Sequence, residues 1–324
     1  MKVLLFTHEQ DIDGMGSVVI GKIAFPNLTY VPCKTFEIDS NFKKYLDDKS
    51  IYDYDLIFVT DLCLHEPILS IINEDEVLRN KVLVLDHHKT EIGNAKYDFV
   101  NVIIECSQGL SSGTYLFYEY LLKNNYLESR PVLDELVEWT RQYDTWDWVK
   151  HNNQKARMLH LLFEQIGYER YVEIMGRIVA NNDSIVFSSE EMEIINDWEA
   201  KFKEDSKSIL DNMSVYIVNI DGRDYRVGYV FTEYKYRNDL NELVKANNVN
   251  DIDLIGMFFP NMNVASYRGV KDIDVSIVPT YFGGKGHKGA GTNPIDNEKF
   301  KDVLDTVSFT NDKIGKEKVN KLVK

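Results

Sequence analysis

Cysteine is scarce in this chain, and its three residues, Cys33, Cys63 and Cys106, show neither a CxxC spacing nor an even framework. We therefore expect reduced thiols and a cytoplasmic protein rather than a disulfide-stapled one. Long apolar runs are also lacking, since no stretch approaches the roughly 20 residues that span a bilayer. The apolar run within residues 1–7 is too short for a signal peptide and predicts a β-strand. No membrane partner is expected.

Positive charge is in deficit, with 37 Lys and Arg against 52 Asp and Glu and a net charge of −15. An acidic chain repels polyanions at long range, which argues against an electrostatic grip on a long duplex. Bound metal ions and a few cations can still reverse the sign locally. The expected ligand is therefore a small or short anion. With 324 residues, 44% of them hydrophobic, the chain can fill two domains.

Short apolar runs alternate with amphipathic segments in the first half of the chain. Three runs are apolar throughout, as strands buried on both faces are: Lys2–Thr7, Asp55–Thr60 and Lys81–Leu85. Helical patterns occupy Gly14–Phe25, Glu66–Ile72, Leu110–Leu122, which Ser111 or Ser112 could cap, and Val132–Tyr143. This alternation predicts an α/β fold with a mostly parallel sheet and helices on both faces.

The second half begins with a charged segment that lacks Gly and Pro, Ser189–Asn212, which is typical of a helical connector. Five short strand patterns follow it, with a helix at Asn238–Asn247 among them: Val215–Ile220, Tyr225–Phe231, Leu254–Phe259, Asn263–Tyr267 and Val275–Val278. We therefore expect a first domain over residues 1–188, a helical linker over 189–212 and a smaller α/β domain over 213–324.

Side chains of ligand type follow each strand predicted for the first domain. His8 follows the first strand, Asp61 ends the second, and the Asp86-His87-His88 triplet follows the third. The carboxyl ends of parallel strands share one edge of a sheet, where open α/β folds place their sites. The adjacent histidines are the sharpest signal, because buried imidazoles need partners for both nitrogens and serve packing poorly.

Three more carboxylates qualify as ligands, although each also has a structural alternative. Asp11 and Asp13, in HEQDIDG, point the same way if this segment is extended, but Asp-x-Asp is also a common turn. Asp144, in RQYDTWDW, stands at a predicted helix end among aromatic residues. Asp61 could equally cap the helix predicted at Glu66–Ile72. Together the carboxylates and imidazoles exceed the needs of one ion and suit two, such as Mn²⁺ or Mg²⁺.

A glycine-rich segment near the C-terminus, GGKGHKGAGT at residues 283–292, predicts a phosphate-binding loop. Its glycines let the backbone approach an anion with the amides exposed. Lys285, His287 and Lys288 add cations or donors. A flexible hairpin is the alternative. The remaining histidines are expected on the surface or on a helix face, and Tyr234 and Tyr236 could stack on a base, which the sequence does not decide.

As a set, these residues resemble the DHH/DHHA1 phosphoesterase superfamily, which the Asp-His-His triplet names. The residues from His8 to Asp144 look like its four N-terminal motifs, and Ser111-Ser112-Gly113-Thr114 at a helix start also fits. Arg268 in SYRG and the glycine-rich segment look like its DHHA1 half. HEQDIDGMGSVVIGKIAFPN is most similar to the NrnB-type oligoribonucleases (nano-RNases). The resemblance implies Mn²⁺-dependent hydrolysis of very short single-stranded RNA to mononucleotides, with Mg²⁺ or Co²⁺ as alternative ions.

The resemblance also implies a role for each residue. One ion would be held by His8, Asp11 and Asp61, and the other by Asp13, Asp61, His87 and Asp144, so that Asp61 is shared. His88 would contact the scissile phosphate, and Asp86 would orient a neighbouring ligand. A phosphate or the terminal nucleotide would be held by Arg268, Gly283, Gly284, Lys285, Gly286 and His287.

Other functions stay open on the same residues. Phosphodiesterases of cyclic or linear dinucleotides and phosphatases of 3′-phosphoadenosine 5′-phosphate use the same chemistry. A non-catalytic nucleotide sensor on this fold is an alternative of another class, but such a protein is expected to have lost ligands. Family-II pyrophosphatases share the metal motifs and carry an Arg-Lys-Lys signature that is not found here. The oligomeric state is not fixed either, and a homodimer is one option.

Overall fold

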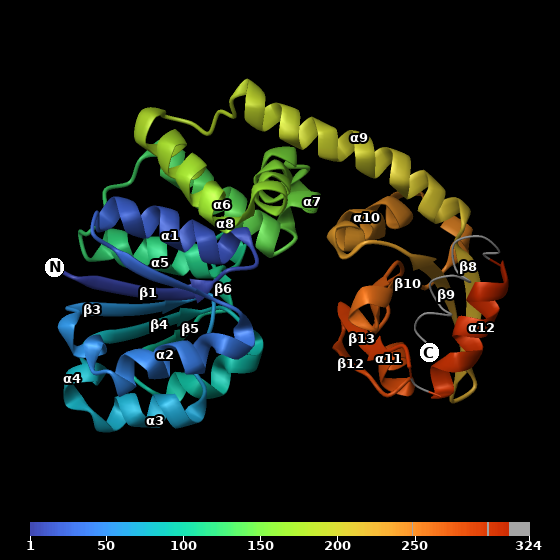
Figure 1. The fold of residues 1–324 in the computed structure, drawn as a ribbon, viewed down its shortest axis with the longest axis horizontal. Helices are drawn as coiled ribbons and strands as arrows, with labels where there is room; N and C mark the ends of the chain where they lie inside the picture. Colours follow the sequence, from blue (N-terminus) through green and yellow to red (C-terminus); the bar gives the residue numbers. More distant parts are fainter. Residues whose placement is uncertain (248, 297, 311–324) are drawn as a thin grey trace. The chain divides into compact units, whose positions relative to one another are not determined.

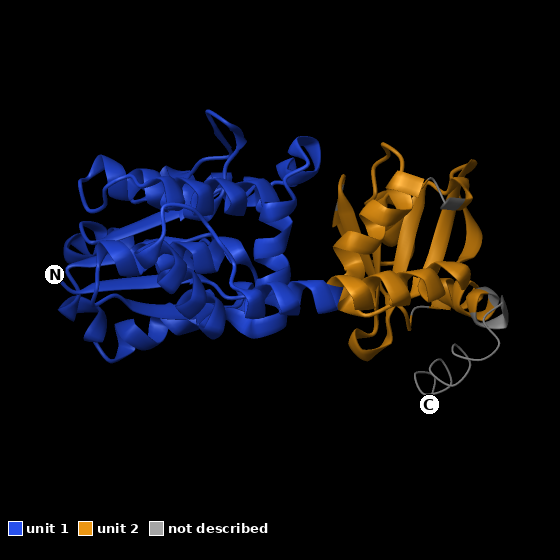
Figure 2. Cartoon of the chain, turned by 90° about the horizontal axis from the view of Figure 1, so that it is seen from above, with its two compact units in different colours: residues 1–198 blue, residues 199–324 orange. Residues whose placement is uncertain are grey.

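A computed structural model describes residues 1–247, 249–296 and 298–310 of the chain. They divide into two compact units, unit 1 with residues 1–198 and unit 2 with residues 199–324 (Figure 2). The division falls inside helix α9, Ser189–Asp211, which covers nearly the whole segment predicted as a connector. None of the helices in the described part of the chain combines the length and the apolar character needed to cross a membrane.

Unit 1 is built on a five-stranded sheet with the strand order β2-β1-β3-β4-β5, in which every pairing is parallel. The strands are β1 Val3–His8, β2 Thr29–Cys33, β3 Leu56–Thr60, β4 Val82–Asp86 and β5 Val100–Val102. The three strands predicted from apolar runs lie at its centre, where both faces are covered. The predicted parallel α/β fold is therefore confirmed.

Helices cover both faces of this sheet (Figure 1). One face carries α1 Ile12–Ala24 and α5 Gly113–Lys123, and the other carries α2 Ile38–Asp47, α3 Glu66–Glu74 and α4 Glu76–Arg79. Successive residues of a strand point to opposite faces. Phe58 accordingly packs on Phe117 of α5, with ring centroids 4.9 Å apart, while its neighbour Val59 joins the core formed with α2 and α3.

The rest of unit 1 packs against α1 through two of its helices. It comprises α6 Pro131–Asp144, α7 Asp147–His151, α8 Gln154–Asn181 and a two-stranded hairpin of β6 Glu105–Cys106 and β7 Gly109–Leu110. Helices α6 and α8 contact each other as well as α1. This layer brings the C-terminal end of α6 to the sheet edge where the predicted ligands lie.

Unit 2 contains a mixed six-stranded sheet with the order β12-β13-β11-β10-β9-β8. Its strands are β8 Ser214–Ile220, β9 Arg223–Phe231, β10 Leu254–Phe259, β11 Val264–Gly269, β12 Lys285–His287 and β13 Ala290–Pro294. Its helices are α10 Arg237–Asn247, α11 Ile277–Tyr281 and α12 Lys301–Thr310. Helix α10 packs on one face and α11 and α12 on the other, each with its own apolar core.

Two expectations for unit 2 need correction. The strand predicted at Val275–Val278 is wrong, because α11 begins at Ile277 and both valines are buried in the core of the face that α11 covers. A short apolar run does not separate a strand from a buried helical turn, and Pro279 is tolerated in a first turn. The glycine-rich segment, predicted as a loop, pairs as the antiparallel hairpin β12–β13.

Arg141 of α6 is almost wholly buried although it is charged. Its Nε and Nη2 donate to the carboxylate of Glu138 at 2.8 and 2.7 Å. Its Nη1 donates to the carbonyl oxygen of Leu110 at 2.9 Å and to Oδ2 of Asp147 at 3.0 Å. One side chain therefore joins α6 to the β6–β7 hairpin and to α7.

Replacing Arg141 should destabilise unit 1 strongly. In Arg141→Leu the buried Asp147 loses a partner, and removing one member of a buried ion pair costs about 3–5 kcal/mol. The exposed Lys150, which also contacts Asp147 at 2.6 Å, provides the matched control. Lys150→Ala should cost at most about 1 kcal/mol. Urea unfolding followed by circular dichroism measures both variants, and an equal, small loss in the two would contradict this role of Arg141.

Candidate metal centre and the polar face of unit 2

The carboxyl ends of three neighbouring strands carry the predicted ligands. His8 is the last residue of β1, Asp61 follows β3, and Asp86 is the last residue of β4. Asp61 adopts a left-handed backbone conformation with φ 59°, which Asp and Asn tolerate better than most residues. Its amide donates to the carbonyl oxygen of Leu85 at 3.1 Å. The strand edge therefore brings these side chains together, as expected from the sequence.

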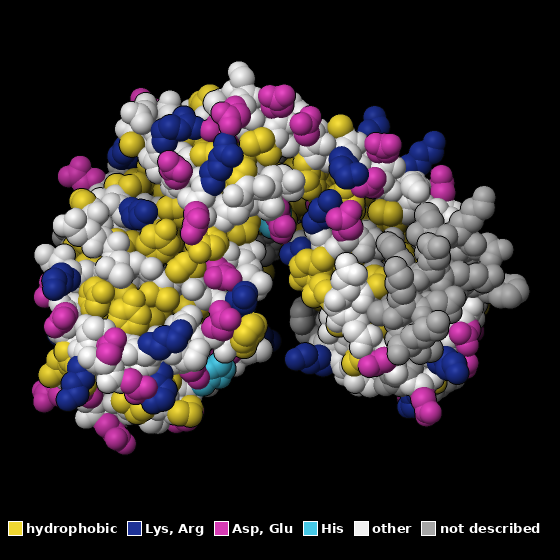
Figure 3. Space-filling model, in the orientation of Figure 1, with side chains coloured by type: hydrophobic (Ala, Val, Ile, Leu, Met, Phe, Trp, Pro, Cys, Tyr) yellow, Lys and Arg dark blue, Asp and Glu magenta, His cyan; other side chains and the backbone are white. Residues whose placement is uncertain are grey.

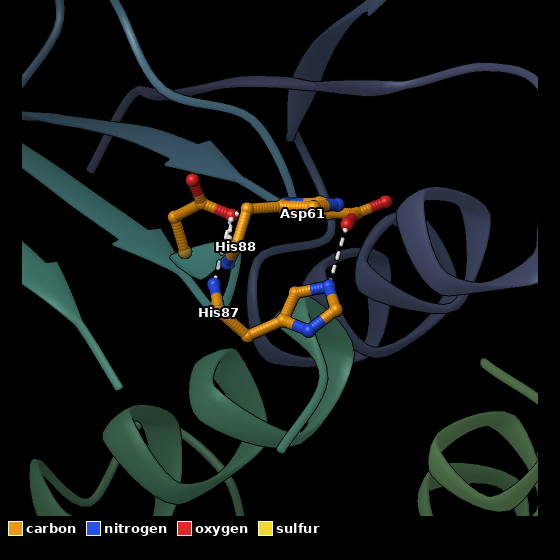
Figure 4. Close-up of side chains that lie close together, drawn as sticks. Asp61, His87 and His88 are labelled. Carbon is orange, nitrogen blue, oxygen red and sulfur yellow. Dashed lines mark hydrogen bonds and ion pairs between the residues drawn. The ribbon is translucent and has the colours of Figure 1, made fainter. Parts of the chain in front are cut away.

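Asp61 lies between two imidazoles, one from the last residue of β1 and one from the residue that follows β4. Its Oδ1 is 3.2 Å from Nε2 of His87 (Figure 4), and its Oδ2 is 3.7 Å from Nδ1 of His8. The side chain is buried, and Oδ2 has no hydrogen-bond partner among the described residues. One carboxylate thus offers an oxygen to each of two groups of ligand atoms.

Asp11 and Asp13 stand at the start of α1 rather than in an extended segment, so their side chains have different partners. Asp11 is the N-cap of α1, and its Oδ1 accepts from the amide of Gly14 at 3.0 Å. Its Oδ2 lies 2.7 Å from Nδ1 of His8. Asp13 belongs to the first helical turn and is wholly buried. The two carboxylates therefore face different groups of atoms.

Asp13 is bound by the N-terminus of α5. Its Oδ2 and Oδ1 accept from the amides of Gly113 and Thr114 at 2.6 and 2.9 Å, and the hydroxyl of Thr114 donates to its carbonyl oxygen. Free amides and the helix dipole favour a carboxylate there. Ser112 is the N-cap of α5, as one of the two predicted candidates. A Cβ on Gly113 would lie 2.5 Å from Cβ of Asp61, so a larger residue would displace that ligand.

His87 completes the second group of ligand atoms. Its Nε2 lies 3.7 Å from Oδ2 of Asp13, 3.6 Å from Oδ2 of Asp144 and 3.2 Å from Asp61. Asp144 is the last residue of α6 and is only partly exposed. The ligand atoms of Asp13, His87 and Asp144 all lie within 4.8 Å of one another, and so do those of His8, Asp11 and Asp61.

Asp86 holds the turn that carries both histidines. Its Oδ1 accepts from the amides of His87 and His88 at 2.8 and 3.3 Å and lies 2.7 Å from Nδ1 of His88. Burial alone would lower the pKa of His88, but the hydrogen bond and charge of Asp86 raise it to about 9. The His88 side chain is half-exposed. It is therefore oriented from within the protein and accessible from solvent.

The carboxylates of this cluster repel one another. Burial and the charges of Asp11 and Asp13 raise the pKa of Asp61 well above its usual value. Burial and the same two charges also raise the pKa of Asp144. Burial opposes ionisation of Asp11, but the hydrogen bond and charge of His8 lower its pKa to about 2. The cluster therefore has an unfavourable excess of negative charge that bound cations would relieve.

The donor atoms fit divalent cations. Asp61 shares one group of ligand atoms with His8 and Asp11 and another with Asp86, His87 and His88. Its Oδ2 has no hydrogen-bond partner within the described residues, and the same holds for Nε2 of His8. The described groups of candidate ligand atoms contain no cysteine sulfur. Oxygen and imidazole donors without thiolates suit Mn²⁺ or Mg²⁺ better than structural Zn²⁺.

Local patterns in the sequence missed two features of this site. The contact of Asp13 with the start of α5 joins residues 100 positions apart, and no local pattern reports such a pairing. His160, expected on the surface or a helix face, lies on α8 but is buried. Its ring stacks on Tyr143, with centroids 4.1 Å apart, and its Nε2 lies 3.3 Å from Glu164.

Arg268 of unit 2 lies on a polar strip of the sheet. Directly opposed residues of antiparallel strands share a face. Arg268 pairs with Ile255, which belongs to the apolar core under α10. Ser266, two residues before Arg268 on the same face, pairs with Thr292, and Thr292 pairs with Lys285. These polar residues therefore share the face that α10 covers elsewhere. The Nη1 of Arg268 donates to Oγ of Ser266 at 3.2 Å. Two cations and two hydroxyls thus occupy one face.

The glycines of the β12–β13 hairpin serve close backbone packing. A Cβ on Gly284 would lie 2.0 Å from the carbonyl oxygen of Thr292, and one on Gly286 would lie 2.7 Å from that of Ala290. Gly283 has a left-handed φ of 77°. The backbone of His287 belongs to β12, but its side chain lies outside the described structure. The hairpin alternative thus holds for the backbone, and phosphate binding stays a prediction.

Comparison with known proteins agrees with this picture. Residues 2–139 match the family model described as DHH family, N-terminal domain. Oligoribonuclease NrnB of Bacillus subtilis (strain 168) is 27% identical over 300 residues, which are 91% of this chain and 73% of that protein. The pGpG-specific phosphodiesterase PggH from Vibrio cholerae has a TM-score of 0.57 at 13% identity, covering 96% of this chain and 99% of that one. Exonuclease RecJ bound to manganese has a TM-score of 0.58 at 10% identity, covering 96% and 90%. These two structures share the fold.

Neutralising Asp61 should stabilise the ion-free protein. Asp61→Asn keeps the side-chain shape and tolerates the left-handed backbone, but it removes one of the mutually repelling charges. We expect a gain of about 1–2 kcal/mol in chelator. In the wild type, Mn²⁺ at a concentration 100-fold above the Kd of one site should stabilise the fold by about 2.7 kcal/mol. Asp61→Asn should lose most of this stabilisation. Thermal unfolding with and without MnCl₂ measures both effects.

The control for this prediction is Asp53→Asn, which removes an exposed carboxylate of the same unit. It should change stability by no more than about 0.5 kcal/mol and should leave the response to Mn²⁺ intact. If Asp61→Asn and Asp53→Asn respond alike to Mn²⁺, Asp61 is not a ligand.

Proposed function

We propose that this chain, whose residues 2–139 match the N-terminal domain of the DHH family, is a two-metal phosphodiester hydrolase that degrades short oligoribonucleotides to mononucleotides. The observation that carries the proposal is the position of Asp61, with one oxygen facing His87 and the other facing His8. The similarity to the oligoribonuclease NrnB, which extends over 91% of this chain, supports the substrate class.

The metal ligands follow from the two groups of atoms. One ion would be held by His8, Asp11 and Asp61, and the other by Asp13, His87 and Asp144. Asp61 would also bind the second ion, because its Oδ1 is 3.2 Å from Nε2 of His87. When bound, such a pair of ions neutralises the charge of a phosphodiester and activates water for attack. Mn²⁺ is the proposed ion for two reasons. Oxygen and imidazole donors suit it, and exonuclease RecJ, which has the same fold, has been solved bound to manganese.

His88 is the proposed contact to the scissile phosphate. Asp86 fixes its ring through Nδ1, which leaves Nε2 without a bond to the described residues. A charged imidazole makes a strong hydrogen bond to a phosphate oxygen. Asp86 therefore acts as a positioning residue, because its own carboxylate is buried beneath the turn.

Unit 2 would bind a phosphate of the substrate through Arg268 and the segment from Gly283 to His287. The guanidinium of Arg268 offers a fork of donors that matches a phosphate. On the face of the molecule drawn in Figure 3, acidic and basic side chains are interspersed, with no basic stripe among the described residues there. Together with the net charge of −15, this favours a short single strand over a long duplex.

The decisive experiment is a substrate panel. We expect Mn²⁺-dependent cleavage of di- to pentaribonucleotides to mononucleotides, with much slower turnover of a cyclic dinucleotide and of 3′-phosphoadenosine 5′-phosphate. Excess EDTA should abolish turnover and leave the circular dichroism spectrum unchanged, because the apolar cores do not depend on the ions. Faster turnover of either alternative substrate would replace the oligoribonuclease proposal, and full activity in chelator would refute the two-metal proposal.

His88 and Asp61 should fail in different ways. His88→Ala should lower kcat by about 10²–10⁴-fold, the range typical of a residue that acts directly on the reacting group. Its Mn²⁺ content should stay near that of the wild type, because His88 is not a proposed ligand. Asp61→Asn should lose both ions and turnover together. Inductively coupled plasma mass spectrometry beside a dinucleotide assay separates the two, and equal metal loss would show that the roles are misassigned.

A further inference from the structure

Two tyrosines lie between β9 and α10 in the single turn Tyr234–Tyr236. Tyr236 is 1% exposed, and its hydroxyl donates to Oδ2 of Asp205 at 2.6 Å. Tyr234 is 49% exposed. Only Tyr234 of this pair therefore presents its ring to a ligand, which separates two residues that the sequence leaves equivalent.

The ring of Tyr234 is held in place on two sides. The guanidinium carbon of Arg237 lies 4.1 Å from the ring centroid, and Nη1 of Arg237 donates to the carbonyl oxygen of Tyr234 at 3.2 Å. The ring of Phe259, at the end of β10, lies edge-on to Tyr234 with centroids 5.2 Å apart. The Arg237 guanidinium and the Phe259 ring thus hold the Tyr234 ring in place in advance, which reduces the entropy lost when a ligand binds.

Arg268 lies on the same face of the sheet as Phe259. Phe259 pairs with Val264 at the start of β11, and Arg268 lies further along β11, on the same face of the sheet. Its bond to Ser266 turns the guanidinium back toward the start of the strand. Burial, and next the positive charge of Arg237, lower the pKa of Arg268. No carboxylate in the described structure pairs with Arg268.

These neighbours match the two ends of one nucleotide. A phosphate gives Arg268 the anionic partner that the described protein does not supply. The exposed Tyr234 ring with Arg237 over it suits a nucleobase, because bases stack on aromatic rings and on guanidinium planes. A bare phosphate ion would use Arg268 but not Tyr234.

We propose that Tyr234 and Arg237 form a nucleobase-stacking platform beside Arg268, so that unit 2 binds a terminal nucleotide of the substrate and not its phosphate alone. The inference rests on the proposed function, because it takes Arg268 to bind a substrate phosphate. Stacking uses the ring face that all four bases share. The substrate class is therefore short RNA of mixed sequence rather than one particular dinucleotide.

The test compares a ligand that has a base with one that lacks it. Isothermal titration calorimetry would measure the binding of 5′-AMP, 5′-UMP and ribose 5-phosphate to the Mn²⁺-loaded protein. Tyr234→Leu keeps apolar packing on Phe259 and removes the ring, while Tyr234→Phe keeps the ring. We expect Tyr234→Leu to weaken both nucleotides by about 5- to 150-fold, the range of one base–aromatic stack. Ribose 5-phosphate should change by less than about twofold, and Tyr234→Phe should resemble the wild type.

Two further variants control the comparison. Tyr281→Ala removes another exposed tyrosine of unit 2, from α11 on the opposite face of the sheet, and should leave all three affinities unchanged. Arg268→Ala should weaken nucleotides and ribose 5-phosphate alike. Equal losses of AMP and ribose 5-phosphate in Tyr234→Leu, or no loss in either, would overturn the platform. If the wild type cleaves no oligoribonucleotide, the proposed function fails instead, whatever the Tyr234 variants bind.

Discussion

The hydrogen bonds from the start of α5 to Asp13 are the interaction on which the geometry of the candidate metal centre depends. They place a wholly buried carboxylate against helix amides instead of against a lysine or arginine. The amides stabilise its negative charge, and within the described residues no cationic side chain competes with a metal ion for the carboxylate. They also fix the start of α5 beneath Asp61, where Gly113 permits contact with the backbone of that residue. Strand edge, α1 and α5 thereby position one another.

The pKa values of buried acids in unit 1 are shifted in opposite directions. Although burial opposes it, bonds from Lys150 and Arg141 lower the pKa of Asp147, as expected for an acid that contributes to stability. Asp61 and Asp144 lie among other carboxylates, which with burial raise their pKa values instead. Such uncompensated charge is typical of functional sites, where stability is given up for chemistry.

Much of the fold and most of the candidate ligands could be predicted from local patterns. Apolar runs marked the central strands of unit 1. The residues that follow these strands meet at one edge because the carboxyl ends of parallel strands all lie at the same edge of the sheet. Patterns of this kind do not report pairings across the chain, such as Asp13 with Gly113, or the burial that separates Tyr234 from Tyr236. The strand prediction for Val275–Val278 was wrong because its valines are buried, and an apolar run of this length is equally compatible with a buried strand and with a buried helical turn.

Two requirements favour aspartate at position 61, a carboxylate oxygen and a backbone with a positive φ. A glutamate would keep the charge but would be poorly accommodated at a positive φ, and a glycine would keep the backbone but offer no oxygen. Related sequences that have kept only the fold can therefore drift at this position to asparagine or glycine with little penalty. On the proposed function, aspartate at this one position should separate homologues under selection for hydrolysis from those retained for binding or architecture.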